Sequence, residues 1–273
     1  MKQRMKFIAP VLLFAALTAV ALPFGKLPTS HASQAAAKKE YVCPPCGCDQ
    51  DGATFDHDGT CPSCGMHLAE KGSLASRPAQ RPPDAPRKQV AILIFEGVEI
   101  IDYTGPWETF GHAGFRVFTV AQKIEPVTNT FGMKVIPDYT FADHPKPDVL
   151  LIPGGNVMLA QKDPQTLKWI QETAAKSEIV LSVCNGAYIL AHAGLLNGLT
   201  ATTTAPLIDG LANVAPNIKV VHDKRFVDNG KIITSGGLSA GIDGALHVVE
   251  RLRGRDAARL TATMMEYRWQ PEP

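Results

Sequence analysis

The stretch EIVLSVCNGAYILAHAGLL (residues 178–196) joins two patterns at a single cysteine, Cys184. The residues before Cys184 form an apolar run of strand length, and the residues after it have the spacing of a helix. A side chain at such a strand-to-helix turn is exposed at the carboxyl edge of a sheet, where ligands bind in open α/β folds. Gly186 and Ala187 are small enough for the tight turn. The stretch therefore predicts a reactive thiol, with a buried structural cysteine as the alternative.

Three similar apolar runs precede this stretch: QVAILIF (89–95), FRVFTVA (115–121) and DVLLIPGG (148–155). Nearly continuous apolar strands are typical of parallel sheets that helices bury on both faces. Helical patterns cover 163–176, 239–254 and 255–269, and Asn229-Gly230 predicts a hairpin within 220–235. This alternation predicts an α/β fold with a doubly wound, mostly parallel sheet and helices on both faces.

The N-terminus has the pattern of a secretory signal peptide. A basic segment, MKQRMK, precedes an uncharged apolar run (7–24), and small residues then lead to a cleavage site after Ala32. The alternative is an uncleaved membrane anchor, because the run approaches the length that spans a bilayer. We therefore expect an exported protein, located in the periplasm or outside the cell.

Composition divides the chain into five segments. These are the signal peptide (1–32), a spacer (33–40), a Cys-rich module (41–69), a Pro-rich linker (70–88) and an α/β domain (89–273). The linker contains too little apolar surface to pack into a core. The net charge of +1 over 273 residues provides no basic field for nucleic acid, so no direct nucleic-acid binding is expected.

The Cys-rich module contains two Cys-x-x-Cys knuckles separated by 14 residues, the spacing of a zinc ribbon. The predicted ligands of zinc or another soft metal ion are Cys43, Cys46, Cys61 and Cys64. Three further residues are alternates: Cys48, His57 and His67. Disulfides are the competing interpretation in an oxidising compartment, although five cysteines would leave one thiol over. Metal or disulfides must stabilise a block this short.

The segments YVCPP (41–45) and CPSCGMHL (61–68) resemble the short heavy-metal-binding domain with the pattern YxCP…CPxCGMxL, found at the ends of copper-efflux proteins. That family usually has Met-His after the first Cys-Pro, where this chain has Pro45-Cys46. The resemblance implies a metal-binding module and leaves the identity of the metal open.

Backbone N–H groups surround the predicted elbow. A helix that begins near Asn185 directs its amide dipoles at the sulfur of Cys184, which favours the thiolate. The candidate donors to an anion that develops on the substrate are Gly154, Gly155, Asn185 and Gly186.

Residues 89–254 resemble the ThiJ/PfpI superfamily of class I glutamine amidotransferase-like domains. The matching stretches are ILIFEGVEIIDYTGPWETF (92–110), DVLLIPGG (148–155), VCNGAYILAHAGLLNGLTATTT (183–204) and RFVDNGKIITSGGLSAGIDGALHVVE (225–250). They are most similar to isonitrile hydratase-like proteins and to the sensor halves of AraC-type regulators. The resemblance implies a flavodoxin-like domain that is commonly dimeric and binds a small molecule, without a cofactor of its own.

The same resemblance implies that Cys184 is the nucleophile and that Asp102 lies beside it. A protonated Asp102 would donate a hydrogen bond to the thiolate and then its proton to the substrate, whereas an ionised Asp102 would raise the pKa of the thiol. The alternative role for Asp102 is to cap the helix that runs through TGPWETF.

Two departures from the family narrow the chemistry. Isonitrile hydratases resemble VCTGA at the elbow, where this chain has Asn185 in place of Thr. Many relatives resemble ATTHW after the elbow helix, where this chain has Thr204 in place of His. Without that base, protease and glutaminase activity are not expected. The sequence favours a cysteine-dependent hydratase or lyase, with a redox- or metal-sensing or ligand-binding protein as the alternative.

Overall fold

The computed structural model describes residues 39–43, 48–50, 52–63, 65, 67–71, 87–214 and 217–270. The predicted signal peptide and most of the spacer and linker lie outside the described residues, as do Cys46 and Cys64. Within the described part of the chain, no helix has the length and apolar character needed to cross a bilayer.

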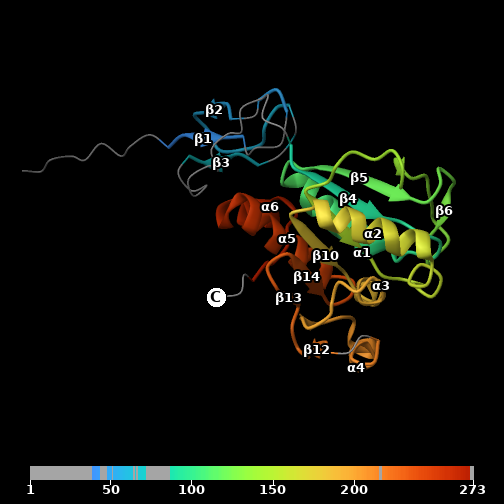
Figure 1. The fold of residues 1–273 in the computed structure, drawn as a ribbon. Coiled ribbons are helices and arrows are strands. Elements are labelled where there is room, and N and C mark those ends of the chain that lie inside the picture. The colour runs from blue at the N-terminus through green and yellow to red at the C-terminus, as the bar shows by residue number, and fades with distance from the viewer. Residues whose placement is uncertain are drawn as a thin grey trace, which may run out of the picture. The chain divides into compact units, whose positions relative to one another are not determined.

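A seven-stranded sheet is central to the α/β domain, in the order β13-β14-β10-β9-β4-β5-β8 (Figure 1). Its strands are β4 (Gln89–Leu93), β5 (Arg116–Ala121), β8 (Tyr139–Thr140), β9 (Val149–Ile152), β10 (Ile179–Ser182), β13 (Phe226–Asp228) and β14 (Ile232–Ser235). All neighbours pair in parallel except β13 and β14, which are antiparallel. The five central strands have the order typical of flavodoxin-like folds. The predicted doubly wound, mostly parallel sheet is confirmed.

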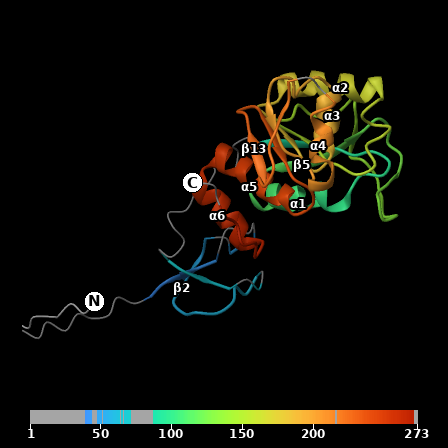
Figure 2. The same cartoon turned by 90° about the horizontal axis from the view of Figure 1, so that it is seen from below.

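Helices cover both faces of this sheet, with α2 and α3 on one side and α1, α5 and α6 on the other (Figure 2). The helices are α1 (Ile100–His112), α2 (Pro164–Lys176), α3 (Gly186–His192), α4 (Ile208–Leu211), α5 (Ala240–Arg253) and α6 (Arg255–Met264), with a 3-10 helix at Ala205–Leu207. Alternate residues of β4 enter the two cores: Ala91 and Leu93 pack with α2 and α3, while Val90 and Ile92 pack with α1 and α5. This two-sided burial explains the nearly continuous apolar strands.

Short strands complete the domain. An antiparallel hairpin joins β6 (Val127–Thr128) to β7 (Lys134–Val135), and β11 (Thr200–Ala201) pairs in parallel with β12 (Lys219–Val220). The predicted hairpin at Asn229-Gly230 forms between β13 and β14, with Gly230 at φ +89°. It is shorter than the predicted 220–235, because Val220 pairs with β11 instead.

Two predicted helices end earlier than expected. The elbow helix α3 stops at His192, because Gly194 adopts φ +75° and the Leu195 amide donates back to the Leu190 carbonyl at 3.0 Å. Helix α6 ends at Met264 instead of continuing to Trp269, and Glu266 turns the chain at φ +51°. The turn leaves the chain after α6 available for contacts with α5.

The Cys-rich module contains a three-stranded antiparallel sheet in the order β2-β1-β3. Its strands are β1 (Tyr41–Val42), β2 (Thr54–Phe55) and β3 (Ala69–Glu70). Cys43, Cys61 and Leu68 form one small buried cluster in the described part of the module, and Val42 of β1 is also buried. So little apolar surface cannot stabilise the module alone, as the sequence predicted.

Candidate functional site

Cys184 lies at the turn between β10 and α3, where its backbone adopts φ +56°. This left-handed conformation is unfavourable for a residue with a Cβ atom, so the surrounding structure must hold it. The Cys184 amide donates to the Gly236 carbonyl at 3.1 Å, and the Thr203 hydroxyl donates to the Cys184 carbonyl at 2.7 Å. Such strain at a partly exposed cysteine is the geometry of a nucleophile elbow.

The elbow packs against the turn that follows β9. A Cβ atom on Gly154 would lie 2.2 Å from Asn185 Oδ1, 2.8 Å from Asp102 Oδ2 and 2.8 Å from Cys184 Cβ. A Cβ atom on Gly186 would lie 2.2 Å from the Ile152 carbonyl oxygen. Both glycines are therefore needed for the close approach of the two turns.

Asp102 is fully buried in the first turn of α1 and contacts the cysteine. Its Oδ2 accepts from the Gly154 amide at 3.1 Å, its Oδ1 accepts from the Leu238 amide at 2.9 Å, and its carboxyl group hydrogen-bonds with Cys184. The alternative capping role is wrong, because Glu99 is the N-cap and accepts from the Ile100 amide. Asp102 instead joins three segments of the site.

Burial raises the pKa of Asp102 from 3.8 to about 6. The amides of Leu238 and Gly154 and the contact with Cys184 oppose this rise, because they stabilise the carboxylate, while the nearby Glu99 charge adds to it. A carboxylic acid in this range exchanges protons readily near neutral pH.

Burial also raises the pKa of Cys184 from 9.0 to about 12, and the Asp102 charge adds to the rise. Hydrogen bonds from the Asn185 amide and the Thr204 side chain act in the opposite direction. The Asn185 amide at the start of α3 favours the thiolate, as the sequence predicted, but desolvation and the Asp102 charge outweigh it, so the pKa of the thiol is raised. Between these two pKa values the pair shares one proton, and its reactive form has the proton on Asp102 and the charge on Sγ.

Each predicted anion-binding amide already has a partner. Gly154 donates to Asp102, Gly155 donates to Asn185 Oδ1 at 2.8 Å, and Gly186 donates to the Val183 carbonyl at 3.0 Å. The Asn185 amide donates to Cys184. Stabilisation of a substrate anion by these amides stays a prediction. It requires that one of the amides divide its hydrogen bond between its present acceptor and the substrate, or leave that acceptor for the substrate.

Asn185 holds the elbow by its side chain and makes no side-chain cap for α3. In addition to the Gly155 contact above, its Nδ2 donates to the Gly155 carbonyl at 2.9 Å. This paired amide contact joins the turn after β10 to the turn after β9. Sequence reasoning had placed Asn185 near the site only through its amide.

Thr204, which replaces the family histidine, contacts the sulfur by its side chain. The five histidines of the domain have partners elsewhere. These pairs are His112–Glu108, His144–Trp169, His192–Tyr188, His222–Asp209 and His247–Asp228. Among the described side chains, Asp102 and not a histidine is therefore placed to transfer protons to and from Cys184.

Sequence reasoning missed the loop 236–239, although it belongs to one of the family-like stretches. Leu238 adopts φ +55° and donates its amide to Asp102, and Cβ on Gly237 would lie 3.1 Å from Cys184 Sγ. The GGLS sequence directly after a buried strand could have indicated a second strained turn at the same sheet edge.

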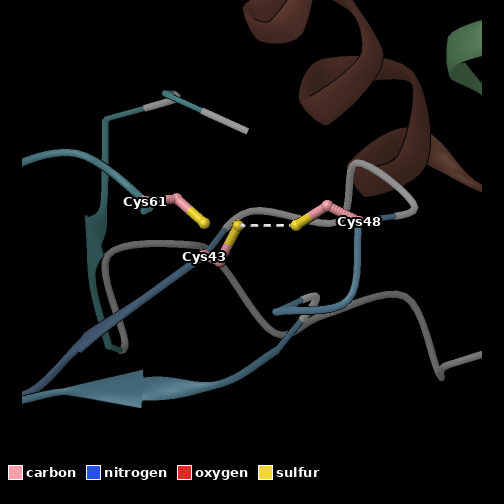
Figure 3. Close-up of side chains that lie close together, drawn as sticks. All are labelled: Cys43, Cys48 and Cys61. Carbon is pink, nitrogen blue, oxygen red and sulfur yellow. Dashed lines mark hydrogen bonds between the residues drawn. The ribbon is translucent and has the colours of Figure 1, made fainter. Parts of the chain in front are cut away.

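The Cys-rich module brings three sulfurs together, those of Cys43, Cys48 and Cys61, within 4.8 Å of one another (Figure 3). The Sγ atoms of Cys43 and Cys48 are 3.8 Å apart, far beyond a disulfide bond of about 2.05 Å. His57 lies instead against the Asp58 carbonyl, and His67 pairs with Thr60. Three close cysteines could hold a metal ion, and they include Cys48, which the sequence gave only as an alternate.

The fold and the site together define a flavodoxin-like domain with a strained cysteine at a nucleophile elbow and a buried carboxyl partner. The family model "DJ-1/PfpI family" matches residues 88–251, and the chain belongs to this family.

Its relatives include an enzyme, a solved structure and a regulator. The chain is 38% identical to isonitrile hydratase from Pseudomonas putida over 182 residues, covering 66% of this chain and 78% of that protein. It is similar to the crystal structure of a ThiJ/PfpI family protein from Pseudomonas syringae, with a TM-score of 0.63, 32% identity and coverage of 72% and 85% of the two chains. It is 24% identical to the HTH-type transcriptional regulator GbdR from Pseudomonas aeruginosa, covering 58% of this chain and 42% of the regulator.

Proposed function

We propose that this protein hydrates an isonitrile or a similar small electrophile, with Cys184 as the nucleophile and Asp102 as the proton donor. The observation that carries the proposal is the hydrogen bond between the buried Asp102 carboxyl and Cys184, with an Asp102 pKa of about 6. The similarity to an isonitrile hydratase over most of the α/β domain supports it.

The terminal carbon of an isonitrile must gain both a nucleophile and a proton. In the first step, the Cys184 sulfur bonds to that carbon and Asp102 transfers its proton to the same carbon, which gives an S-linked thioimidate and an Asp102 carboxylate. Water then adds to the carbon as Asp102 takes back a proton. Transfer of the hydroxyl proton to nitrogen and release of the thiolate yield an N-substituted formamide, so one water is consumed and the pair is regenerated.

The same contacts argue against amide hydrolysis. A leaving amine needs a proton relay beside the nucleophile, and Thr204 occupies the place of the family histidine. Addition to an isonitrile has no leaving group, so one carboxyl group suffices for the protons.

Formamide production from an alkyl and an aryl isonitrile, followed by mass spectrometry in oxygen-18 water, tests this proposal. We expect one labelled oxygen per product, no turnover by Cys184→Ala and a loss of about 10²-fold or more in kcat for Asp102→Asn. Asp163→Asn is the matched control, because Asp163 caps α2 and Asn caps equally well. Turnover by Cys184→Ala, or none by the wild-type protein, would refute the proposal.

We further propose that Cys43, Cys48 and Cys61 are three ligands of a zinc ion or another soft metal ion. Zn–S bonds of about 2.3 Å in a tetrahedron place sulfurs about 3.8 Å apart. The Cys43–Cys48 Sγ distance of 3.8 Å fits this geometry. Cys46 and Cys64 lie outside the described residues and stay candidates for the remaining ligand.

Metal analysis of protein purified without chelator tests this ligand set. We expect one metal ion per chain, reduced occupancy in Cys48→Ser and full occupancy in the control Cys184→Ser. Full occupancy in Cys48→Ser would return the fourth position to Cys46 and exclude Cys48.

Sensing is the second candidate function, and the similarity to a transcriptional regulator favours it. In that case Cys184 would act as a redox switch or the site would bind a ligand without turnover. Peptide mapping after mild peroxide would find Cys184 oxidised before Met264 or Met265. Oxidation of the methionines first would exclude the redox version.

Export and dimerisation are also proposals. The basic and apolar N-terminal pattern supports export. Separately, the family resemblance supports a homodimer. Large apolar side chains are exposed in the β6–β7 turn and in the segment between β9 and α2, including Phe131 at 80% and Leu159 at 80%, and such surface is typical of an interface. N-terminal sequencing of cell fractions and sedimentation velocity test the two proposals; an uncleaved cytoplasmic monomer would contradict both.

A further inference from the structure

Two side chains remote from the sulfur, those of Arg225 and Tyr267, contact the loop 236–239 at Ser239, and a third, Asp243, binds both of them. Arg225 precedes β13, Asp243 lies in the first turn of α5, and Tyr267 follows α6. Arg225 Nε donates to Asp243 Oδ2 at 2.7 Å, and the Tyr267 hydroxyl donates to the same oxygen at 3.0 Å. We name these three residues the Asp243 cluster.

The side chains of Arg225 and Tyr267 contact the loop at Ser239, and the Arg225 backbone contacts it at Gly236. Arg225 Nη2 donates to Ser239 Oγ at 3.2 Å, and the Tyr267 hydroxyl lies 3.4 Å from the Ser239 carbonyl oxygen. The Gly236 amide donates to the Arg225 carbonyl at 3.0 Å. One loop is thus held at both ends by elements that are distant in sequence.

The near side of the same loop contacts both members of the reactive pair, Cys184 and Asp102. Gly236 accepts from the Cys184 amide at 3.1 Å, Gly237 lies against the sulfur, and Leu238 donates its amide to Asp102 at 2.9 Å. Leu238 also adopts a left-handed φ of +55°, which a loop does not keep without support. The support comes from the far side of the loop.

We propose that the Asp243 cluster positions Leu238 so that its amide stabilises the Asp102 carboxylate, and that the cluster thereby sets how readily the Cys184–Asp102 pair loses its first proton. Arg225, Asp243 and Tyr267 are positioning residues, since none of them contacts the sulfur or the Asp102 carboxyl in the described contacts. The inference rests on the proposed Cys184–Asp102 pair and extends it to residues with no assigned role.

The charged groups near Asp102 decide which substitution tests the proposal without changing the charge around the site. Glu99 approaches from the N-cap of α1 and Cys184 from the elbow, while the turn after β9 and the loop 236–239 contribute uncharged amides. Asp243→Asn would remove a negative charge near the site as well as its hydrogen bonds. Tyr267→Phe removes only the hydroxyl, so it separates loop positioning from electrostatics.

The rate of Cys184 alkylation by iodoacetamide, measured from pH 4 to 9 on the full chain, reports the first proton loss of the pair. We expect a wild-type inflection near pH 6 and an upward shift of about half to one unit in Tyr267→Phe, because a loosened Leu238 amide stabilises the carboxylate less. Arg225→Lys keeps the charge and one donor, so it should give a smaller shift in the same direction. Hydrogen exchange of the Leu238 amide should accelerate in both variants.

Tyr139→Phe is the matched control, because the Tyr139 hydroxyl accepts from Arg116 at 2.8 Å on β8, at the other edge of the sheet from β13. An unchanged inflection and unchanged Leu238 exchange in Tyr267→Phe would overturn the proposal, and so would an equal shift in Tyr139→Phe. Loss of the inflection in wild-type protein would instead refute the Cys184–Asp102 pair. None of these readouts depends on isonitrile turnover.

Discussion

At the scale of single residues, two features set the chemistry of Cys184: close backbone packing and a buried negative charge. Gly154 admits no side chain, because Asn185, Asp102 and Cys184 all lie within 2.8 Å of the position of its Cβ atom. Burial raises the pKa of Asp102, and Glu99 raises it further. Each feature can be changed at one residue.

Gly154→Ala should destabilise the domain by about 1–3 kcal/mol, since the new methyl group overlaps with atoms of both turns. Gly111→Ala is the matched control, because nothing lies within 4 Å of the Cβ position there and the residue is helical. The control should be neutral or stabilising by up to about 1 kcal/mol. Urea denaturation measures both, and equal stability of the two variants would contradict the packing argument.

Glu99→Gln should lower the pKa of Asp102, because it removes the like charge while Gln can still accept from the Ile100 amide. The inflection of Cys184 alkylation would then move below that of the wild-type protein. Glu96→Gln makes the same chemical change at an exposed residue that accepts from the Thr128 amide. A shift in the Glu96 variant as large as that in the Glu99 variant would indicate a non-specific charge effect.

At the scale of elements, the site depends on contacts between turns that follow different strands. The turns after β4, β9, β10 and β14 meet at one edge of the sheet, because parallel strands place their carboxyl ends together. Asn185 illustrates this, since its side chain exchanges two hydrogen bonds with Gly155. The conformation of the elbow turn therefore depends more on its contacts with the turn after β9 than on the local preferences of its own residues.

Asn185→Ala should cost about 1–3 kcal/mol of stability and should change the rate of Cys184 alkylation, because the Gly155 amide and carbonyl lose their partner. The control is Asn197→Ala, an exposed residue in the turn after α3, which should change stability by less than about 0.5 kcal/mol. Thermal unfolding and alkylation rates test the pair. If Asn185→Ala behaves like the control, the elbow does not rely on this contact.

At the scale of the whole molecule, the raised pKa of Asp102 makes folding stability depend on pH. The folded pKa of about 6 exceeds the value of 3.8 for the free side chain, so the folded state binds the proton more tightly. The stabilisation is fully present below about pH 3.8 and is lost as pH rises through about 6. The difference corresponds to about 3 kcal/mol.

Subtracting the stability of Asp102→Asn from that of the wild-type protein isolates this contribution from the other carboxyl groups. We expect the difference to fall by about 2.5 kcal/mol between pH 4 and pH 7, whatever its absolute value, because a small part of the contribution is already lost at pH 4. Guanidinium denaturation at several pH values provides the measurement. A difference that is constant across this window would show that the Asp102 pKa is not raised.

The sequence by itself determined the class of fold, the four central parallel strands β4, β5, β9 and β10, the hairpin turn and the place of Cys184 at a strand-to-helix turn. These features follow from the spacing of apolar residues and from turn chemistry, which act between near neighbours in the chain. The family resemblance also indicated Asp102 as the partner of Cys184. The lengths of α3 and α6 were less predictable, because the turns at Gly194 and Glu266 end them.

Only the tertiary structure decided the hydrogen-bond partners of Asp102 and Asn185 and the pKa of Cys184. It brings the Leu238 amide to Asp102 across 136 residues of sequence and pairs Asn185 with Gly155. It also makes burial, not the helix dipole, control the pKa of Cys184. The physical reason is that desolvation and hydrogen bonding depend on what surrounds a group in space, and strand order, which sequence periodicity does not encode, sets those surroundings.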